Sequence, residues 1–430
     1  MSARQRMETW NKRYFGGQLP EPILGMLSAA PIERTDVAAF FERYFRLMQR
    51  GHFSARDISP LQAGVLGTLV APILPGAWSG RIPSVTMAGR HARLDEFVGD
   101  NRYRSADPGL ILDIGCGYPP TTSLDTVAAL PDWQVVAADP AMPAWVVYDE
   151  DGNYATIDEE RNVLYMQPAL PNMQGWTDIL CHREGSEDRF LTLFNRLLPA
   201  LDSQAEIRID GTRLVCPHRL YETEQISLLQ QGIGEIDIDN VDVIRCYNVL
   251  VYYDADFRQQ ALEWFEEILT EGGLLLIGAD WAHTTECRGS VYQKLDGKLI
   301  HQELAFSVDN LCSFSIFPWY ALVDDDYETL QLAEVTRILR GDEAFLGRLD
   351  AFGNDQRARH GLGQRGADGY YGSPDASLDP SQLWHAAQLM SRALDAGLAD
   401  AAVAVLQSAG LQAWVNDIGH VAIKPNGTLR

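Results

Sequence analysis

The hydrophobic and polar positions of the first hundred residues follow the period of helices. In residues 36–50 apolar side chains recur every three or four positions, with Asp36 placed to cap the first turn and Gly51 to end the last. The same pattern predicts a second helix at about 59–71, before two prolines. We therefore predict that residues 1–104 form a helical N-terminal domain.

From Leu110 the pattern changes to short apolar runs that alternate with helical segments, which is typical of a parallel sheet with crossover helices. Between the last two runs lies a segment with one apolar stripe, which predicts a crossover helix that ends at Gly272. We therefore predict an α/β fold with helices on both faces of the sheet. The predicted strands are 110–114, 133–139, 241–249 and 273–279.

Three Asp-Gly dipeptides stand between strand-like runs. Because Asp-Gly tolerates the positive φ angles of a tight turn, each of them predicts a β-hairpin. Two fall in the long segment between the second and third predicted strands, so we expect a hairpin insertion at about 146–216. The dipeptides are Asp151–Gly152, Asp210–Gly211 and Asp296–Gly297.

Residues 331–378 are predicted to form a helix followed by a Gly-rich segment. The part from 353 onward has no apolar period, so it is either an interdomain linker or a mobile lid over an acidic acceptor. Residues 379–430 follow as a small α+β module, with helices from about Pro380 and Leu398 and then a hairpin. The basic and aromatic residues of the Gly-rich segment are Arg357, Arg359, Arg365, Tyr370 and Tyr371.

The composition is that of a globular protein with a large core: 430 residues, 46% of them hydrophobic and 22% charged. The net charge of -24 predicts no nucleic-acid partner, because a phosphate backbone would be repelled. No apolar run has the length of a membrane span or of a signal peptide, so we expect a cytoplasmic protein without membrane association. The six cysteines form no C-x-x-C pair, so we expect neither a metal site nor disulfides.

The stretch 110–120, LILDIGCGYPP, places two glycines one residue apart directly after a predicted strand. A dinucleotide site needs a third glycine where this chain has Pro120, and a nucleoside triphosphate loop needs a lysine that is absent here. Two interpretations of the loop remain. It is a tight turn without a ligand, or its backbone passes close to a nucleoside without phosphates, such as S-adenosylmethionine.

Two acids favour the ligand. Asp113 precedes the loop, where it could meet an ammonium or hydroxyl group, and Asp139 ends the next strand, where folds of this class place a carboxylate against ribose hydroxyls. The spacing from Gly117 to Asp139 leaves room for one crossover helix. The ordered pair therefore predicts S-adenosylmethionine as the cofactor.

Four segments, ILDIGCG, VVAADP, DVIRCYNVLVYYD and GGLLLIG, together resemble the class I S-adenosylmethionine-dependent methyltransferases. Residues 243–280 are similar to the corresponding segment of the chemotaxis receptor glutamate methyltransferases. Tyr247 stands where that family usually has arginine, and Thr86 and Arg90 have the spacing of its Thr-x-x-x-Arg element without the aromatic pair between them. The matching positions are Cys246, Asn248, Val249, Leu250, Tyr252, Asp254, Gly272, Gly273 and Gly278.

The resemblance implies a Rossmann-like seven-stranded methyltransferase sheet in residues 105–330, with the inserted hairpins inside it and the helical domain before it. It covers 110–280, and residues 1–104 in outline. The residues expected to contact the cofactor are Arg90, Asp113, Gly115, Cys116, Gly117, Tyr118, Asp139, Pro140, Cys246, Tyr247 and Asn248.

Methyl transfer of the implied kind needs the acceptor held in line with the cofactor and water excluded, without a covalent nucleophile. Asn248, at a strand end, would fix the acceptor or the cofactor, or would only cap a turn. Tyr252 would face the sulfonium with its ring, or would pack in the core. His283 would serve as general base for an amine or hydroxyl acceptor, unless it is a solvated surface residue.

The leading hypothesis is methyl transfer to an oxygen or nitrogen atom of a small-molecule or peptide acceptor in a biosynthetic pathway. The first alternative is a protein carboxyl (glutamate) methyltransferase of the chemotaxis type. The second is a regulatory protein that binds S-adenosylmethionine without catalysis. A nicotinamide-dependent oxidoreductase is disfavoured by Pro120.

Overall fold

The computed structural model describes most of the chain and divides it into two compact units. Unit 1 consists of residues 1–74, 247–262 and 274–430, and unit 2 of residues 75–246 and 263–273. Each unit is described by itself. The described residues are 2–73, 86, 88–100, 103, 108–169, 179, 182–280, 287–312, 320–322 and 327–425.

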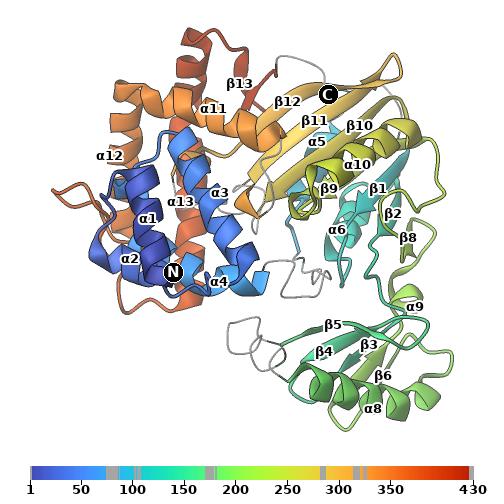
Figure 1. Ribbon diagram of the computed structural model, residues 1–430. Helices are drawn as coiled ribbons and strands as arrows, with labels where there is room; N and C mark the ends of the chain where they lie inside the picture. Colours follow the sequence, from blue (N-terminus) through green and yellow to red (C-terminus); the bar gives the residue numbers. More distant parts are fainter. Residues whose placement is uncertain are drawn as a thin grey trace. The chain divides into compact units, whose positions relative to one another are not determined.

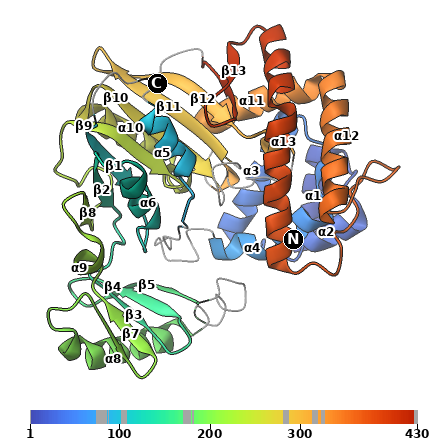
Figure 2. The same ribbon diagram turned by 180° about the vertical axis from the view of Figure 1, so that it is seen from behind.

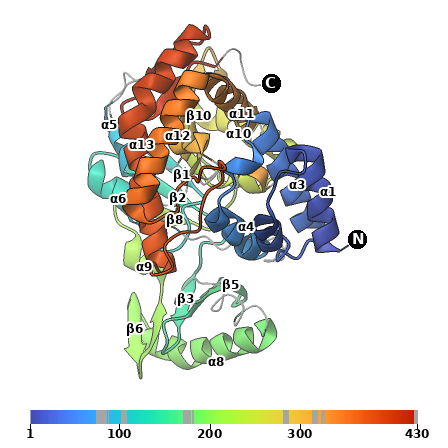
Figure 3. The ribbon, with the colours of Figure 1, turned by 90° about the vertical axis from the view of Figure 1, so that its left-hand side faces the viewer.

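The helices of unit 1 come from both ends of the chain and share one hydrophobic core. Figure 1 and Figure 3 show α1 and α3 beside the C-terminal helices, and Figure 2 shows α13 along α12. A capping box of Ser2 and Gln5 begins α1, and one of Asp379 and Gln382 begins α13. The helices are α1 (Ala3–Phe15), α2 (Glu21–Leu27), α3 (Thr35–Arg50), α4 (Pro60–Ile73), α11 (Tyr327–Gly341), α12 (Glu343–His360) and α13 (Pro380–Ser408).

The stripe of apolar residues predicted in the first helices is buried as expected. Phe41, Tyr44 and Phe45 of α3 are fully buried. Phe41 contacts Trp10 of α1, Phe45 contacts Phe15 of α1, and Tyr44 packs against Phe45. The predicted helical N-terminal segment is therefore present in the residues that the structure describes.

A single helix, α13, replaces the two helices predicted from Pro380 and Leu398. Gly397, directly before the predicted start of the second helix, lies inside α13 and serves packing. A Cβ atom at Gly397 would lie 2.6 Å from the ring of Phe352 on α12. The absence of a side chain lets the two helices approach closely, at the cost of about 1 kcal/mol in helix propensity.

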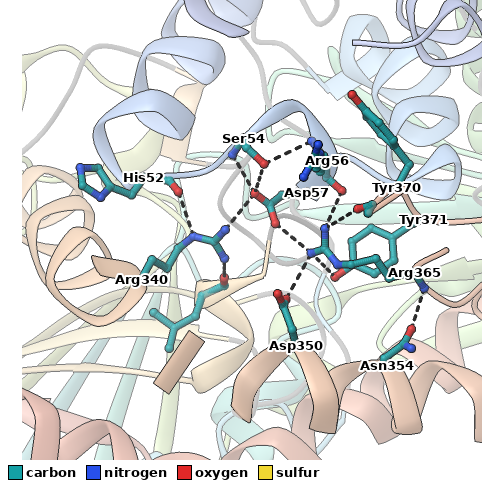
Figure 4. Close-up of polar contacts among 12 residues, drawn as sticks. His52, Ser54, Arg56, Asp57, Arg340, Asp350, Asn354, Arg365, Tyr370 and Tyr371 are labelled. Carbon is teal, nitrogen blue, oxygen red and sulfur yellow. Dashed lines mark hydrogen bonds and ion pairs between the residues drawn. The ribbon is translucent and has the colours of Figure 1, made fainter. Parts of the chain in front are cut away.

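The Gly-rich segment after α12 is anchored to the helical core of unit 1, so neither a free linker nor a loose lid describes it. Arg365 donates to Asp57 at 3.0 Å and to Asp350 at 3.2 Å, and Arg340 donates to the other carboxylate oxygen of Asp57 at 2.8 Å (Figure 4). The ring of Tyr371 lies under the guanidinium of Arg365, 4.2 Å away. We name this set the Asp57 network: Asp57, Arg340, Asp350, Arg365 and Tyr371.

The strands of unit 1 form an antiparallel arrangement. The hairpin predicted at Asp296–Gly297 joins β11 (Cys287–Leu295) to β12 (Lys298–Phe306), and both turn residues have positive φ. The predicted C-terminal hairpin is also present, as β13 (Ala413–Val415) and β14 (Val421–Ile423), and β14 pairs with β12. Short 3-10 helices lie at Ala55–Asp57 (η1), Leu250–Tyr252 (η3) and Val308–Leu311 (η4).

Unit 2 contains the parallel sheet that the apolar runs predict. β1 (Leu110–Ile114) pairs in parallel with β2 (Gln134–Ala138) and with β9 (Val241–Tyr247), and β2 pairs with β8 (Ile226–Leu229). Helices α5 (Ala92–Gly99) and α6 (Thr121–Ala129) belong to the same unit, with α9 at Pro217–Tyr221. The α/β class is confirmed.

The end of the crossover helix differs from the prediction. α10 spans Ala255–Ile268, and β10 follows at once as Leu269–Asp280, so Gly272 lies inside a strand with φ of 83°. A double glycine after an amphipathic helix resembles a helix stop. Here the two glycines lie in the first residues of β10, where the backbone turns tightly. A Cβ atom at Gly273 would lie 2.9 Å from the carbonyl oxygen of Thr270.

Among the described residues, the large sheet has the strand order β9-β1-β2-β8 within unit 2 and β13-β14-β12-β11-β10 within unit 1. Seven of these strands come from the segment 105–330. The remaining two, β13 and β14, come from the C-terminal module. The prediction missed this extension because a three-residue strand carries almost no periodicity.

The insertion predicted at about 146–216 is a separate five-stranded antiparallel sheet in unit 2, with the order β5-β4-β3-β7-β6. The two Asp-Gly dipeptides lie at its β3–β4 and β6–β7 turns. α8 (Arg183–Leu201) packs on one face of this inserted sheet (Figure 1). Its strands are β3 (Trp145–Tyr148), β4 (Tyr154–Ile157), β5 (Val163–Gln167), β6 (Glu206–Ile209) and β7 (Thr212–Val215).

Candidate functional site

The predicted site residues of unit 2 follow the carboxyl ends of parallel strands. The register pairs Ile114 of β1 with Ala138 of β2 and with Cys246 of β9, so all three strands end at one edge. In open α/β sheets this edge is where ligands bind. The glycine loop leaves from β1, and Asp139 follows β2 directly.

The glycine loop and Asp139 are joined by hydrogen bonds. Gly115 and Gly117 both have φ of 72°, a conformation that favours glycine. The amide of Gly117 donates to Oδ2 of Asp139 at 3.2 Å, and the amide of Ala141 donates to Oδ1 at 2.7 Å. The glycine loop and Asp139 thus lie together, and their contact with the cofactor stays a prediction.

Cys116 and Tyr118, both predicted to contact the cofactor, are nearly fully buried. Burial raises the pKa of the Cys116 thiol well above its ordinary value, and the charges of Asp139 and Asp113 add to this effect, so the thiol stays protonated. The hydroxyl of Tyr118 hydrogen-bonds with that of Tyr148 at 3.2 Å. Pro140, in contrast, is exposed.

Asp113 lies in a buried ion-pair network rather than at an open surface. Arg245 of β9 donates to both carboxylate oxygens of Asp113, at 3.0 and 2.7 Å, and Ser123 of α6 donates to Oδ2 at 2.6 Å. Arg245 also donates to Asp95 at 2.8 Å, which ties α5 to the sheet. These bonds engage both carboxylate oxygens of Asp113. Direct contact between Asp113 and the cofactor stays a prediction.

The two aspartates of this network differ in their surroundings. Burial raises the pKa of Asp95 to about 6, and the opposite charge of Arg245 offsets only part of that effect. Oδ2 of Asp95 has no hydrogen-bond partner among the described residues. Sequence reasoning did not place Arg245 in the site, although an arginine inside an apolar strand is a signal of a buried ion pair.

Arg90 lies next to this network along the chain and is half-buried, while its predicted partner in the motif, Thr86, is also half-buried. The neighbouring His91 is nearly fully buried. Burial lowers its pKa well below the ordinary value, and the charges of Arg245 and Arg90 act in the same direction. His91 is therefore neutral at pH 7.

In unit 1, Asn248 and Asp280 form the second part of the predicted site. The side-chain amide of Asn248 donates to the Asp280 carboxylate at 2.7 Å and to its carbonyl oxygen at 3.0 Å, and it accepts from the Asp280 amide at 3.0 Å. Asn248 has φ of 57°, a conformation that asparagine tolerates better than most residues. Its backbone amide donates to Gly278. These contacts fix the strand end in one conformation.

Tyr247 is buried in a slot that two glycines create. A Cβ atom at Gly278 would lie 2.2 Å from the Tyr247 ring, and one at Gly289 would lie 2.5 Å from its hydroxyl oxygen. Both glycines are therefore needed for the ring to lie there. This packing explains the motif glycine at 278 in physical terms. It also shows that the side chain at 247, where the resembled family has arginine, lies against the paired glycines of β10 and β11.

The remaining predicted catalytic residues are less well supported. Tyr252 is half-buried and packs against the core of unit 1, whereas Tyr253 is exposed and stacks on Phe257 at 4.2 Å. His283 lies outside the described residues. Its role as a general base stays a prediction.

The described part of the chain contains no group of three or more His, Cys, Asp or Glu side chains arranged to hold a metal ion. Within the same described ranges, no helix is both long enough and apolar enough to cross a membrane.

Residues 235–285 match a family model described as the CheR methyltransferase SAM binding domain. The matched segment contains β9, Asn248, α10 and β10. A comparison with curated proteins finds no match. The match covers 51 of the 430 residues and supports the predicted enzyme class, an S-adenosylmethionine-dependent methyltransferase, and the predicted cofactor.

Solved structures of methyltransferases are also similar, at low identity. A putative S-adenosyl-L-methionine-dependent methyltransferase from Methanococcus maripaludis is 12% identical, with 85% of this chain and 90% of that chain covered and a TM-score of 0.23. The plantazolicin methyltransferase BpumL, solved with SAH, is 12% identical, with 73% and 80% covered and a TM-score of 0.25. PKMT2 from Rickettsia typhi is 10% identical, with 76% and 44% covered and a TM-score of 0.23, so this chain spans less than half of its length. No conclusion about this chain rests on likenesses of this size.

Proposed function

We propose that this methyltransferase transfers the methyl group of S-adenosylmethionine to an oxygen or nitrogen atom of a small-molecule or peptide acceptor. The observation that carries the cofactor half of the proposal is the hydrogen bond between Gly117 and Asp139. It places a carboxylate beside a glycine loop that carries no phosphate-binding lysine or third glycine.

The protein's contribution to the reaction is positioning. When bound, S-adenosylmethionine supplies a sulfonium methyl: the acceptor's lone pair forms a bond to the methyl carbon while the carbon–sulfur bond breaks and leaves its electron pair on sulfur. A carboxylate acceptor gives an ester without releasing a proton, whereas a hydroxyl or protonated amine must lose one. In this proposal Asp139 would hold the ribose hydroxyls, Asn248 would hold the acceptor or the cofactor, and buried Tyr118 would exclude water.

Asp113 takes a positioning role in this proposal. Its carboxylate is held by Arg245 and Ser123, so it fixes the end of β1 and the start of α6, and the glycine loop runs between them. The loop's conformation, and through it the site, would then depend on a buried ion pair.

Two alternative functions remain proposals of lower rank. A glutamate carboxyl methyltransferase of the chemotaxis type is supported by the family match over 235–285. It is disfavoured by Tyr247, which stands where the resembled family has arginine, a residue suited to a carboxylate. A regulatory protein that binds the cofactor without turnover is the other alternative.

The test begins with thermal unfolding in the presence of S-adenosylhomocysteine or NAD. A ligand at a hundredfold excess over its dissociation constant stabilises the fold by about 2.7 kcal/mol. We expect S-adenosylhomocysteine to raise the melting temperature and NAD to leave it unchanged. A shift with NAD alone would contradict the proposal. Turnover of S-adenosylmethionine against phenols, amines, peptides and carboxylates then separates the three functions.

A further inference from the structure

We propose that one face of the inserted sheet is the acceptor-binding wall of the enzyme, and that it takes a flat, uncharged aromatic group that carries a hydrogen-bond acceptor. We name it the tyrosine face. It is defined by Tyr148, Tyr154, Tyr165 and Gln167 of the sheet, with Tyr118 of the glycine loop and Tyr221 of α9 packed against it. The inference rests on the proposed function and names the substrate class for it.

The register of the inserted sheet places these side chains in rows. Tyr148 pairs with Tyr154, and Tyr154 pairs with Gln167, so the three lie side by side across β3, β4 and β5. In the next row Thr156 pairs with Tyr165. Because side chains two residues apart on a strand share a face, both rows point to the same side. The rings of Tyr154 and Tyr165 are 6.4 Å apart, and those of Tyr148 and Tyr154 are 5.2 Å apart.

The other face of the inserted sheet is an ordinary core. Val147, Ala155 and Met166, which alternate with the tyrosines, pack against Phe190 and Phe194 of α8. The side of the sheet that faces α8 is therefore stabilised by the burial of apolar residues. The tyrosines on the opposite side need a separate explanation.

The tyrosine face contacts the predicted cofactor loop. The ring of Tyr118, the residue after Gly117, lies 6.1 Å from Tyr154 and 6.4 Å from Tyr221. Tyr165 also lies near the loop. Burial raises the pKa of Tyr165 well above its ordinary value, and the neighbouring Tyr154 hydroxyl and Asp139 carboxylate add to this effect. The aromatic wall and the loop thus form one continuous region of unit 2.

Two polar groups on this face are buried without a hydrogen-bond partner in the part of the chain that the structure describes. They are the hydroxyl of Tyr165 and the side-chain nitrogen of Gln167, and the side chains are 4% and 3% exposed. Buried polar groups in native proteins are nearly always hydrogen-bonded, and leaving one unmade is unfavourable. An amide nitrogen can only donate, so the missing partner must offer an acceptor atom, such as a carbonyl or hydroxyl oxygen.

The charge of the face indicates an uncharged ligand. The first row continues onto β7 and β6 with two cations, Arg213 and Arg208, and both pair with Glu206. The guanidinium of Arg213 lies over the ring of Tyr148 at 4.1 Å. The buried tyrosines are neutral at pH 7, because burial raises their pKa values. A carboxylate here would lose its hydration without gaining a free cation, whereas a flat ring gains stacking contacts.

The experiment uses a matched pair of probes, 7-hydroxycoumarin and 7-hydroxycoumarin-3-carboxylate, which differ by one charged group. Each is titrated by fluorescence into the full-length protein saturated with S-adenosylhomocysteine, at a pH where the hydroxyl of the first probe is neutral. We expect saturable binding of the neutral probe and binding of the carboxylate at least tenfold weaker. Binding of the carboxylate as tightly as the neutral probe would overturn the proposal, as would no saturable binding of either.

Two variants test the residues. Tyr165→Phe removes only the unpartnered oxygen, and Gln167→Leu replaces the unpartnered amide with an apolar group of similar size. Each should weaken the neutral probe about fivefold, the loss expected for one neutral hydrogen bond. Because neither group has a partner in the free protein, both variants should melt at the wild-type temperature or above. Trp145→Phe, which alters the α8 side of the same sheet, is the control and should bind the probe as the wild type does.

The outcomes separate this inference from the proposed function. The affinity of each variant for S-adenosylhomocysteine is measured by calorimetry in parallel. Wild-type protein that binds S-adenosylhomocysteine but no coumarin overturns the inference and leaves the proposed function standing. Variants that lose S-adenosylhomocysteine and keep the coumarin assign these atoms to the cofactor, and so overturn it too. Protein that binds neither ligand contradicts the proposed function itself.

Discussion

Two buried aspartate–arginine networks, one in each unit, have opposite effects on their carboxylates. In unit 1, the pKa of Asp57 would be raised by burial, but Arg340, the Ser54 amide and Arg365 together hold it below its ordinary value. In unit 2, burial of Asp95 outweighs Arg245 and raises the pKa to about 6. An arginine partner alone therefore does not decide the charge state of a buried carboxylate.

The number of donors explains the difference. Oδ2 of Asp57 accepts from the backbone amide and hydroxyl of Ser54 and from Arg340, while Oδ1 accepts from Arg365 (Figure 4). Asp95 receives its donors, Arg245 and Thr126, on Oδ1 alone. Hydrogen bonds to both oxygens replace the lost hydration, and a single occupied oxygen does not. The Asp57 network thus holds an ionised carboxylate among the helices of unit 1. The Arg245 network instead contains a carboxylate, Asp95, with a pKa of about 6.

Removal of the Asp57 carboxylate should give the largest effect. Asp57→Ala leaves Arg340 buried without its charge partner, which costs about 3–5 kcal/mol of unfolding free energy. Urea unfolding at pH 7 measures it. The control is Asp36→Ala, which removes a half-exposed ion pair with Arg34 and should cost about 1 kcal/mol or less. Equal losses in the two variants would show that burial of the Asp57 network has no energetic consequence.

The two aspartates should give stability slopes of opposite sign with pH. Asp95 has a folded pKa of about 6 against an ordinary value of 3.8, so its contribution is fully present below about pH 4 and is lost as the pH rises through 6. The expected loss is about 3 kcal/mol for two pKa units. Asp57 has a lowered pKa, so its contribution to the free energy of unfolding is present at pH values above its ordinary pKa. That contribution is lost as the pH falls into the acid range.

Urea unfolding of wild type and Asp95→Asn from pH 4 to pH 7 checks this sign. The wild-type curve should contain the falling component, and the variant should lack it. A difference between the two proteins that does not change with pH would contradict the raised pKa of Asp95.

The smallest effect is expected in unit 2, where one donor is removed from the carboxylate of Asp113. Ser123→Ala removes one donor from Asp113, whose oxygens keep their two bonds from Arg245, so the expected loss is about 1.5–3 kcal/mol for a hydrogen bond to a charged group. Urea unfolding and the affinity for S-adenosylhomocysteine are measured together. If Asp113 positions the glycine loop, the affinity falls as well. A stable variant with unchanged affinity would remove the positioning role.

Local signals account for the parts of the fold that could be predicted. β1 was placed correctly because an apolar run before glycine allows few alternatives. The Asp-Gly turns were placed correctly because each has its glycine at positive φ, as have Asp210 and Asp296 in two of the three. Gly272 was misleading: it was predicted to end a helix, but it lies in the first residues of a strand. Gly397, next to the predicted start of a helix at Leu398, lies inside α13 and allows close helix packing. A glycine shows where a side chain is absent, not which neighbour needs the space.

The candidate site also contains one contact that the sequence predicts and others that it does not. Strand order predicts that Gly117 and Asp139 meet, because both follow adjacent parallel strands. Arg245 and Asp95, 150 positions apart in the sequence, meet only through the packing of α5 on the sheet unit. The tyrosine face depends on the register of the inserted sheet, where a shift of one residue would turn Tyr165 and Gln167 to the α8 side.

The most direct test of the central claim is calorimetric titration of S-adenosylhomocysteine into the wild type and Asp139→Asn. We expect saturable one-site binding to the wild type. Binding to the variant should be about tenfold to a hundredfold weaker, because a hydrogen bond to a charged group contributes about 1.5–3 kcal/mol. Wild-type protein that gives no saturable heat, or a variant that binds as tightly as the wild type, would contradict it.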